Sequence, residues 1–142
     1  MRAGPFKDLQ QLYAGRIVPP PAIVELEERR SLPPEQLKLR EGELILGALP
    51  SRTPFIALDG RGAQLSSRTL AERIGVWRDQ GTPELAFGIG GAEGLHRAVL
   101  DRANLTLSLG PMTWPHLLVR GMLLEQLYRA QRILAGHPYH RQ

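Results

Sequence analysis

Short apolar segments alternate with segments of helical character along this chain, and that alternation limits the folds open to it. The apolar segments are 22–28 (AIVELEE), 54–59 (PFIALD), 85–90 (LAFGIG) and 105–110 (LTLSLG). The segments predicted as helices are 5–17, 34–49, 66–80, 92–102 and 114–135. Strands separated by helices pair in parallel through crossover connections. We therefore predict an α/β fold with a mainly parallel sheet flanked by helices.

The chain has 142 residues, which is enough for one domain, residues 1–142, with a single core. It contains no cysteine, which excludes disulfides, thiolate metal ligands and cysteine nucleophiles. Its apolar runs are short and interrupted by charges, so we expect no contact with a membrane. The first residues carry no secretory pattern, and the sequence predicts a cytoplasmic protein.

Arginine dominates the basic residues: 16 of the 18 are arginines, and only Lys7 and Lys38 are lysines. Guanidinium groups match phosphate geometry and stack on bases, so a nucleic-acid partner is one interpretation. An arginine-rich surface without such a partner is the other, and composition alone does not separate them. Arg29 and Arg30, in a predicted exposed turn, are candidate contacts to a phosphate backbone.

Glycines follow three of the predicted strands, in the sequences LDGRG, GIGGAEG and SLGPMTWP. Ligands of parallel α/β sheets bind at the carboxyl ends of the strands, so these loops predict a small-molecule site. The second loop does not fit the dinucleotide pattern G-x-G-x-x-G, because Glu93 stands where Gly88 and Gly90 require the third glycine. Either a ligand-contacting loop or a plain glycine turn explains it.

The loop LGPMTWPH leads into the longest predicted helix, and its polar groups favour a helix start. Thr113 is a candidate cap, and Pro115 fits the first turn, where no amide donor is needed. Free N–H groups at such a start suit adenine nitrogens or a carboxylate, although a well-terminated turn without a ligand explains the same residues.

The helix predicted over 114–135 is apolar around more than half of its circumference. The residues concerned are Leu117, Leu118, Val119, Met122, Leu123, Leu124, Leu127 and Tyr128. Because a helix at the surface shows a narrower apolar stripe, we expect this one at the interface of a symmetric homodimer. Gly136 and Pro138 are the expected stop signals at its end.

Four polar residues interrupt that apolar surface. His116 and Arg120 share a face by their spacing, as do Glu125 and Arg129. The second pair is either a simple helix ion pair or part of a functional site. His116 with His137 and His140 would make a histidine-only metal site, but no carboxylate accompanies them and we predict no metal.

Several of these segments together resemble the RlmH family of ribosomal RNA large-subunit methyltransferases, which are minimal SPOUT-class enzymes. They are GIGGAEGL, LSLGPMTWPHLLVRGMLLEQLYRAQ and the terminal GHPYHR. The early AGP, the REGELIL helix and ALDGRGAQLSS are similar as well, so the resemblance covers nearly the whole chain. Family members begin with an apolar strand before AGP, whereas here Met1 lies two residues before this motif.

The resemblance implies an α/β knot, in which the C-terminal segment of a homodimer is threaded into a trefoil knot. It implies S-adenosyl-L-methionine as methyl donor and N3 of a pseudouridine in 23S ribosomal RNA, within the ribosome, as acceptor. The absence of cysteine excludes the covalent route of pyrimidine carbon methylation but is compatible with nitrogen methylation.

The same resemblance assigns site residues. The cofactor pocket would consist of Leu58, Gly90, Gly91, Gly110, Pro111, Met112, Thr113, Trp114 and Pro115. The reaction centre would consist of His116, Arg129, Tyr139, His140 and Arg141. A non-catalytic RNA-binding protein with the same fold is the alternative, and an intact cofactor loop beside an intact terminal motif argues against it. A Rossmann-type enzyme would need the missing third glycine and an acidic residue on the next strand.

Overall fold

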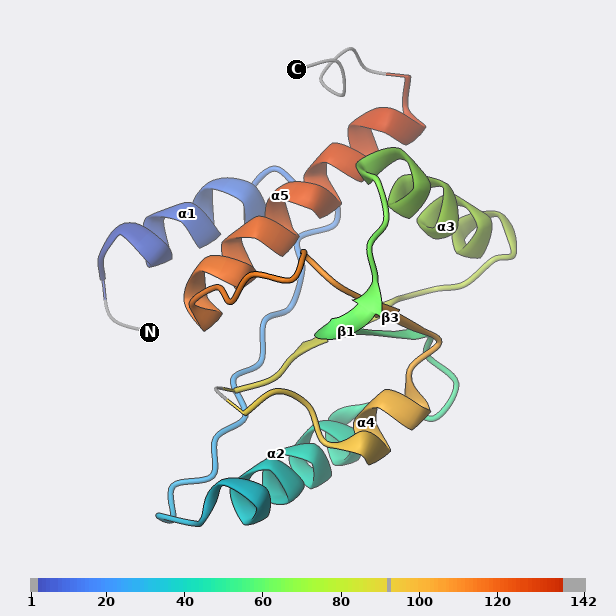
Figure 1. The fold of residues 1–142 in the computed structure, drawn as a ribbon. Coiled ribbons are helices and arrows are strands. Elements are labelled where there is room, and N and C mark those ends of the chain that lie inside the picture. Colours follow the sequence, from blue (N-terminus) through green and yellow to red (C-terminus); the bar gives the residue numbers. More distant parts are fainter. Residues whose placement is uncertain (1–2, 92, 137–142) are drawn as a thin grey trace. The chain divides into compact units, whose positions relative to one another are not determined.

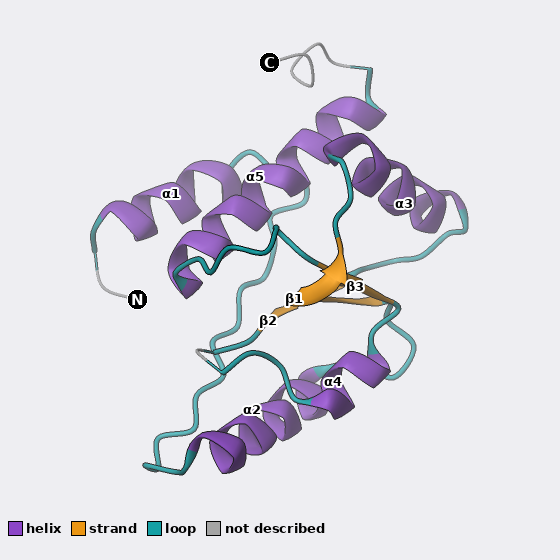
Figure 2. Cartoon of the chain, viewed as in Figure 1, coloured by secondary structure: helices purple, strands orange, loops and turns teal. Residues whose placement is uncertain are grey.

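The structure, a computed structural model, describes residues 3–91 and 93–136. The chain forms two compact units, and each is described by itself. The helical unit consists of Met1–Ile23, Leu65–Gly81 and Leu117–Gln142, and the sheet unit of Val24–Gln64 and Thr82–His116. Figures 1 and 2 show the order of elements along the chain.

The sheet unit has three parallel strands in the order β2-β1-β3. The strands are β1 (Phe55–Ala63), β2 (Ala86–Ile89) and β3 (Leu105–Leu107). Central β1 pairs Phe55 with Ala86 on one side and Ile56 with Leu105 on the other. Three of the four predicted strands are thus confirmed, and with them the α/β class and the parallel sheet.

Two helices, α2 (Pro34–Ala48) and α4 (Arg97–Arg102), lie side by side on this sheet (Figure 2). A buried apolar cluster of the unit consists of Phe55, Ala57, Leu95 and Val99. Gly42 of α2 lets this helix come close, because an added Cβ would lie 3.1 Å from the Cβ of His96 and 3.3 Å from Cγ2 of Val99. The apolar core therefore fixes the sheet whose strand ends carry the glycine loops.

The prediction of a strand over 22–28 is wrong. These residues have no regular secondary structure, and all but Glu28 are exposed. An apolar run becomes a strand only when a neighbouring strand accepts its backbone hydrogen bonds, and Pro19, Pro20 and Pro21 supply no donors just before it.

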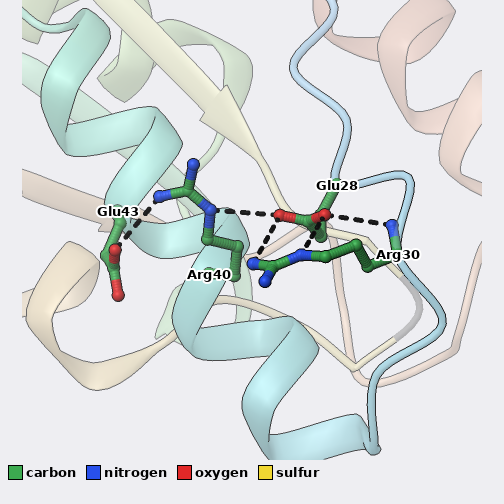
Figure 3. A network of polar contacts seen from close by, with 4 residues as sticks. All are labelled: Glu28, Arg30, Arg40 and Glu43. Carbon is green, nitrogen blue, oxygen red and sulfur yellow. Dashed lines mark hydrogen bonds and ion pairs between the residues drawn. The ribbon is translucent and has the colours of Figure 1, made fainter.

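An ion-pair network holds this extended segment instead (Figure 3). The carboxylate of Glu28, 10% exposed, accepts hydrogen bonds from Nε of Arg30 and Nε of Arg40, each at 3.0 Å. Nη1 of Arg40 reaches Glu43 at 3.1 Å. The hydrogen bonds from Arg30, joined by the one from Arg40, lower the pKa of Glu28 to about 2. Charge pairing with α2 thus replaces strand pairing here.

The helical unit contains α1 (Pro5–Ala14), α3 (Ser67–Asp79) and α5 (His116–Leu134), whose first residue belongs to the sheet unit. Figure 1 shows α1 alongside α5. Gly121 of α5 is buried, and the side chain of Leu9 occupies the space where its Cβ would be. On another side, a Cβ at Gly75 of α3 would lie 2.9 Å from Cδ2 of Leu134. Both contacts bring helices closer than larger residues would allow.

Aromatic and polar contacts add to this packing. The rings of Tyr13 and Tyr128 lie 6.4 Å apart, and the guanidinium of Arg16 lies within 6 Å of both centroids. Gln131 of α5 exchanges two hydrogen bonds with the backbone of Val18, at 2.6 and 3.1 Å. Much of the apolar surface of α5 is therefore covered within its own unit.

Helix ends agree with the sequence at some positions and differ at others. Ser66 caps α3 by accepting a hydrogen bond from the backbone N–H of Thr69. Gly136 has φ +74° just after α5, as predicted for the end of that helix. Pro138 lies outside the described residues. The first helix ends at Ala14, three residues earlier than expected.

Two helix starts were predicted too early. The helix expected over 92–102 begins at Arg97, because the His96 side chain caps it through the backbone N–H of Ala98. The long helix begins at His116 and not near 114, so Thr113 is not its cap and Pro115 lies before its first turn. Residues 113–115 are left in an exposed loop.

Candidate active site

The carboxyl ends of the three parallel strands lie at one edge of the sheet unit, and each leads into a predicted site segment. Leu58, 7% exposed, pairs with Ile89 on one side and Leu107 on the other. It is the last paired residue of β1 before the register shift that leads to Ala63. Its backbone therefore lies between the glycine loop after β2 and the loop after β3.

An acidic side chain next to Leu58 fastens the glycine loop. Asp59, 6% exposed, accepts hydrogen bonds from Nε and Nη2 of Arg61 at 2.8 and 3.0 Å and from the backbone N–H of Leu95 at 3.4 Å. The same Nη2 donates to the carbonyl oxygen of Leu95 at 3.0 Å. These hydrogen bonds, those from Arg61 first, lower the pKa of Asp59 to about 2. A clamp from β1 thus holds the far end of the loop.

Sequence reasoning missed this clamp. The segment LDGRG was recognised as a strand end with glycines, but the carboxylate and guanidinium within it were not singled out. Two residues of opposite charge at i and i+2 were the available signal. Their shared target, Leu95, lies more than thirty positions further along the chain and gives no local signal.

The glycine loop after β2 is a tight turn. The backbone N–H of Gly94 donates to the carbonyl of Gly91 at 3.0 Å, and Gly94 has φ +80°, a conformation that favours glycine. A Cβ at Gly90 would lie 2.8 Å from the backbone C and O of Gly94. Gly90 and Gly91 are therefore required by the close approach of the loop to itself and to α2, whose Glu41 faces Gly91.

The loop after β3 is open to solvent. Its first turn is set by Ser108, whose Oγ accepts a hydrogen bond from the backbone N–H of Gly110 at 3.1 Å and donates to the carbonyl of Gly110 at 3.2 Å. Gly110 has φ +109°. Residues 111–116 are exposed, Met112 by 70% and Trp114 by 39%. Within the described chain, the backbone N–H groups of residues 112–114 donate no hydrogen bond.

His116 joins the two loops. Its Nδ1 lies 2.8 Å from the carbonyl oxygen of Gly90. A carbonyl oxygen only accepts, so this nitrogen carries the proton and the other ring nitrogen, Nε2, is the proton-accepting one when the ring is neutral. Of the predicted site residues, the structure thus brings together Leu58, Gly90, Gly91, the loop 110–115 and His116.

The other predicted site residues belong to the helical unit or fall outside the described residues. Arg129 belongs to the helical unit, where its Nε donates to Glu125 at 2.9 Å, the i, i+4 ion pair that was one of its two interpretations. Arg120 of the same helix donates to Gln10 of α1 at 3.1 Å. Tyr139, His140 and Arg141 lie outside the described residues, as does His137 of the metal site considered above.

The loops have the properties of a cradle for a nucleoside-like ligand. Three consecutive N–H groups form no hydrogen bond with the described residues, the space beside Gly110 is open, and Trp114 and Met112 offer exposed apolar surface. Such groups hold a purine base and its substituents by backbone hydrogen bonds and apolar contact. S-adenosylmethionine combines an adenosine with a short charged chain, and the residues present fit it.

Comparisons with known proteins identify the family of this chain. The family model described as "Predicted SPOUT methyltransferase" matches residues 1–140. No helix in the described part of the chain has the length and apolar character needed to cross a membrane.

Three relatives are each named ribosomal RNA large subunit methyltransferase H. The proteins from Rhodospirillum centenum, Paramagnetospirillum magneticum and Rhodospirillum rubrum are 54%, 52% and 49% identical to this chain over 140 residues. Each match covers 99% of this chain and 92% of the relative. The resemblance seen in the motifs is thereby confirmed. The chain belongs to the SPOUT methyltransferases and, within them, to the RlmH family.

Proposed function

We propose that this protein is an S-adenosylmethionine-dependent methyltransferase that methylates N3 of a pseudouridine in 23S ribosomal RNA. The observation that carries the proposal is the contact between Nδ1 of His116 and the carbonyl oxygen of Gly90. This contact joins the loops after β2 and β3 in a chain that belongs to a methyltransferase family. The relatives' names support ribosomal RNA of the large subunit as the substrate class. The choice of N3 and of pseudouridine follows from the family resemblance of the motifs.

The cofactor pocket of this proposal consists of Leu58, Gly90, Gly91 and the loop Gly110–Pro115. When bound, S-adenosylmethionine supplies an electrophilic methyl group on a positively charged sulfur. The backbone N–H groups of Met112, Thr113 and Trp114 donate to acceptors of the ligand, and the open space beside Gly110 lets the ligand approach the backbone closely. Asp59 and Arg61 hold the loop in place through Leu95, outside the reacting atoms.

His116, when neutral, has the tautomer that such a reaction needs. The N3–H of a pseudouridine is an imide proton that must leave before or during methylation, and a neutral imidazole is a suitable acceptor. The Gly90 carbonyl holds the proton on Nδ1 and so presents Nε2 for the N3 proton. His116 is exposed at the end of the loop, where an RNA base has access.

The proposal also includes the groups that the described structure does not test. By the family resemblance, Tyr139, His140 and Arg141 complete the reaction centre with Arg129, in a knotted homodimer. In this arrangement Arg141 neutralises developing negative charge on a base carbonyl or binds phosphate, and Tyr139 holds the face of the base. A splayed-out loop nucleotide is the form of RNA that such a site accommodates.

The deciding experiment is methyl transfer from radiolabelled S-adenosylmethionine to ribosomes that lack the modification. We expect one methyl group per 23S RNA, at N3 of a pseudouridine, as read by mass spectrometry of the digested RNA. Ribosomes in which that pseudouridine is uridine serve as the control for the base. Cofactor binding without transfer to any ribosomal RNA would favour the non-catalytic alternative, and transfer to another RNA would overturn the substrate.

A further inference from the structure

We infer that Glu41 of α2 is a cofactor-binding residue, whose carboxylate accepts a hydrogen bond from a donor group of S-adenosylmethionine. The inference rests on the function proposed above and adds a residue that neither the motifs nor the family assignment singled out. Its starting point is a close approach: a Cβ added at Gly91 would lie 3.0 Å from Oε2 and 3.1 Å from Oε1 of Glu41. Both carboxylate oxygens therefore lie against the glycine loop.

This carboxylate has no partner within the described chain. None of the described residues donates a hydrogen bond to Glu41 or forms an ion pair with it, although its side chain is half-buried. A half-buried carboxylate loses part of its hydration, and the usual compensation is a cation or several N–H donors. A half-buried carboxylate without a protein partner, next to the proposed pocket, is what we expect of a group that binds a ligand.

The arginines that would neutralise Glu41 are engaged elsewhere. Its sequence neighbour Arg40 is bound on both sides, by Glu28 at 3.0 Å and by Glu43 at 3.1 Å, as Figure 3 shows. Arg61, the basic residue that reaches the same glycine loop, is bound to Asp59. Because both arginines pair with other carboxylates, neither of them forms an ion pair with Glu41.

The cofactor offers groups of matching chemistry. S-adenosylmethionine carries hydrogen-bond donors on its α-ammonium group, on its ribose hydroxyls and on the adenine amino group, and it has a positively charged sulfur. A carboxylate oxygen accepts from any of these donors, and the hydrogen bond from the charged ammonium is stronger than one from a neutral donor. The acceptor is the Glu41 carboxylate. Ligands that each lack one of the donor groups identify the group of S-adenosylmethionine that Glu41 binds.

The test is calorimetric binding by the full-length chain and by the variant Glu41→Gln. Glutamine keeps the shape but loses the charge and one acceptor oxygen. Glu93→Gln is the matched control, because Glu93 is an exposed glutamate of the glycine loop that forms no hydrogen bond or ion pair with the described residues. We expect the Kd for S-adenosylmethionine to rise about tenfold or more in Glu41→Gln and by less than about twofold in Glu93→Gln.

Two further ligands separate the donors. S-adenosylhomocysteine keeps the ammonium and the adenosine but has no charge on sulfur, and 5′-methylthioadenosine keeps the adenosine without the ammonium. Equal losses with all three ligands assign Glu41 to the adenosine, through a ribose hydroxyl or the adenine amino group. A loss with S-adenosylmethionine and S-adenosylhomocysteine, but not with methylthioadenosine, assigns it to the ammonium. A loss confined to S-adenosylmethionine shows attraction to the sulfonium charge without a hydrogen bond, and it overturns the inference.

Two other outcomes also overturn it, and they are distinguishable. If the unmodified chain binds S-adenosylmethionine and Glu41→Gln binds equally well, the inference fails while the proposed function stands. If the unmodified chain binds none of the three ligands, the proposed function fails and the inference fails with it. Thermal unfolding of Glu41→Gln and of the unmodified chain shows whether a changed affinity reflects a lost fold. If Glu41→Gln does not fold, the same binding measurements are made with Glu41→Asp, whose shorter side chain keeps the charge but moves the carboxylate away from Gly91.

Discussion

Nδ1 of His116 and the carbonyl oxygen of Gly90 lie 2.8 Å apart, so the end of the loop after β3 is fastened to the start of the loop after β2. One ring thereby has two tasks in the proposed reaction. Its Nδ1–H holds the loops together, and its Nε2 accepts a proton. Two substitutions of His116 distinguish the two roles.

His116→Asn places an amide N–H close to the position of Nδ1, whereas His116→Ala removes both nitrogens. We expect His116→Asn to bind S-adenosylmethionine within about threefold of the unmodified protein but to methylate more than about a hundredfold more slowly. His116→Ala should lose affinity as well as rate. Calorimetry and single-turnover methyl transfer measure the two effects, and a normal rate in His116→Asn would exclude His116 as the proton acceptor.

Gly110 and Gly47 form a matched pair for testing the loop after β3. Both have open space where a Cβ would be, but Gly110 has φ +109° whereas Gly47 lies in α2 without positive φ. Gly110→Ala should strain the loop by roughly 1–3 kcal/mol and weaken cofactor binding accordingly. Gly47→Ala should leave binding unchanged and stabilise α2 by up to about 1 kcal/mol. Equal cofactor affinities in the two variants would place the ligand away from this loop.

The Asp59–Arg61 clamp predicts a stability change in acid. The pKa of Asp59 is lowered from 3.8 to about 2, so its contribution is fully present above about pH 4 and is lost as the pH falls toward 2. The contribution is roughly 1–2 kcal/mol, less than the full shift implies because Arg61 is 59% exposed.

Denaturant unfolding between pH 6 and pH 2 measures this contribution. Asp59→Asn should be less stable than the unmodified chain at pH 6, and the difference should shrink as the pH falls through the window. Asp79→Asn is the control, because Asp79 and its partner Arg78 are 72% and 58% exposed. A constant difference for Asp59→Asn across the whole range would contradict the lowered pKa.

Arginine contacts to RNA predict a steep salt dependence of binding, and two neighbouring residues test where the contacts are. The sequence suggested Arg29 and Arg30 alike, but Arg30 is bound to Glu28 whereas exposed Arg29 has no partner among the described residues. Arg29→Ala should reduce the slope of log Kd against log salt concentration by about one, and Arg30→Ala by less. Filter binding of a ribosomal RNA fragment at several salt concentrations measures the slopes of both variants and of the unmodified protein. Equal slopes in all three proteins would show that Arg29 does not contact the RNA.

The terminal motif GHPYHR predicts a catalytic contribution from residues outside the described structure. Deletion of residues 137–142 should leave the dimer and part of the cofactor affinity but abolish methyl transfer. Arg141→Ala alone should lower the rate more than tenfold, which corresponds to about 1.4 kcal/mol of transition-state stabilisation. Deletion of Gln142 alone is the control. A near-normal rate without the six residues would remove them from the reaction centre.

The fold could largely be predicted because local patterns and tertiary contacts agree. Apolar runs near 55, 86 and 105 became the three strands, and Ser66 capped its helix. The segment 22–28 has the same apolar character but no neighbour to pair with, and pairing partners are not encoded in a local pattern. An early start was predicted for α5 because Thr113 and Pro115 both suit the start of a helix. The prediction was wrong, since residues 113–115 form a loop and the helix begins at His116.

The candidate site could be recognised in part for the same reason. Glycines and the sequence after β3 were visible as motifs, so Gly90, Gly110 and His116 were named as candidates. The contacts that organise them were not, because the Asp59–Leu95 hydrogen bond and the approach of Glu41 to Gly91 join residues tens of positions apart. The apolar surface of α5 predicted a dimer, but α1 and α3 cover part of it, as the contacts at Gly121 and Gly75 show. The dimer therefore stays a prediction.

The central place of β1 has a consequence for synthesis of the chain. Its partners begin about thirty and about fifty residues later in the sequence, so no part of the sheet can form until the segment near Phe87 has been made. Contacts of such separation make folding slower than local ones do. Phe55 and Ile56, fully buried in the finished protein, are exposed on the growing chain until then. Translation from residue 56 to residue 107 is thus the interval in which these side chains lack a completed sheet, and chaperone contacts should be concentrated there.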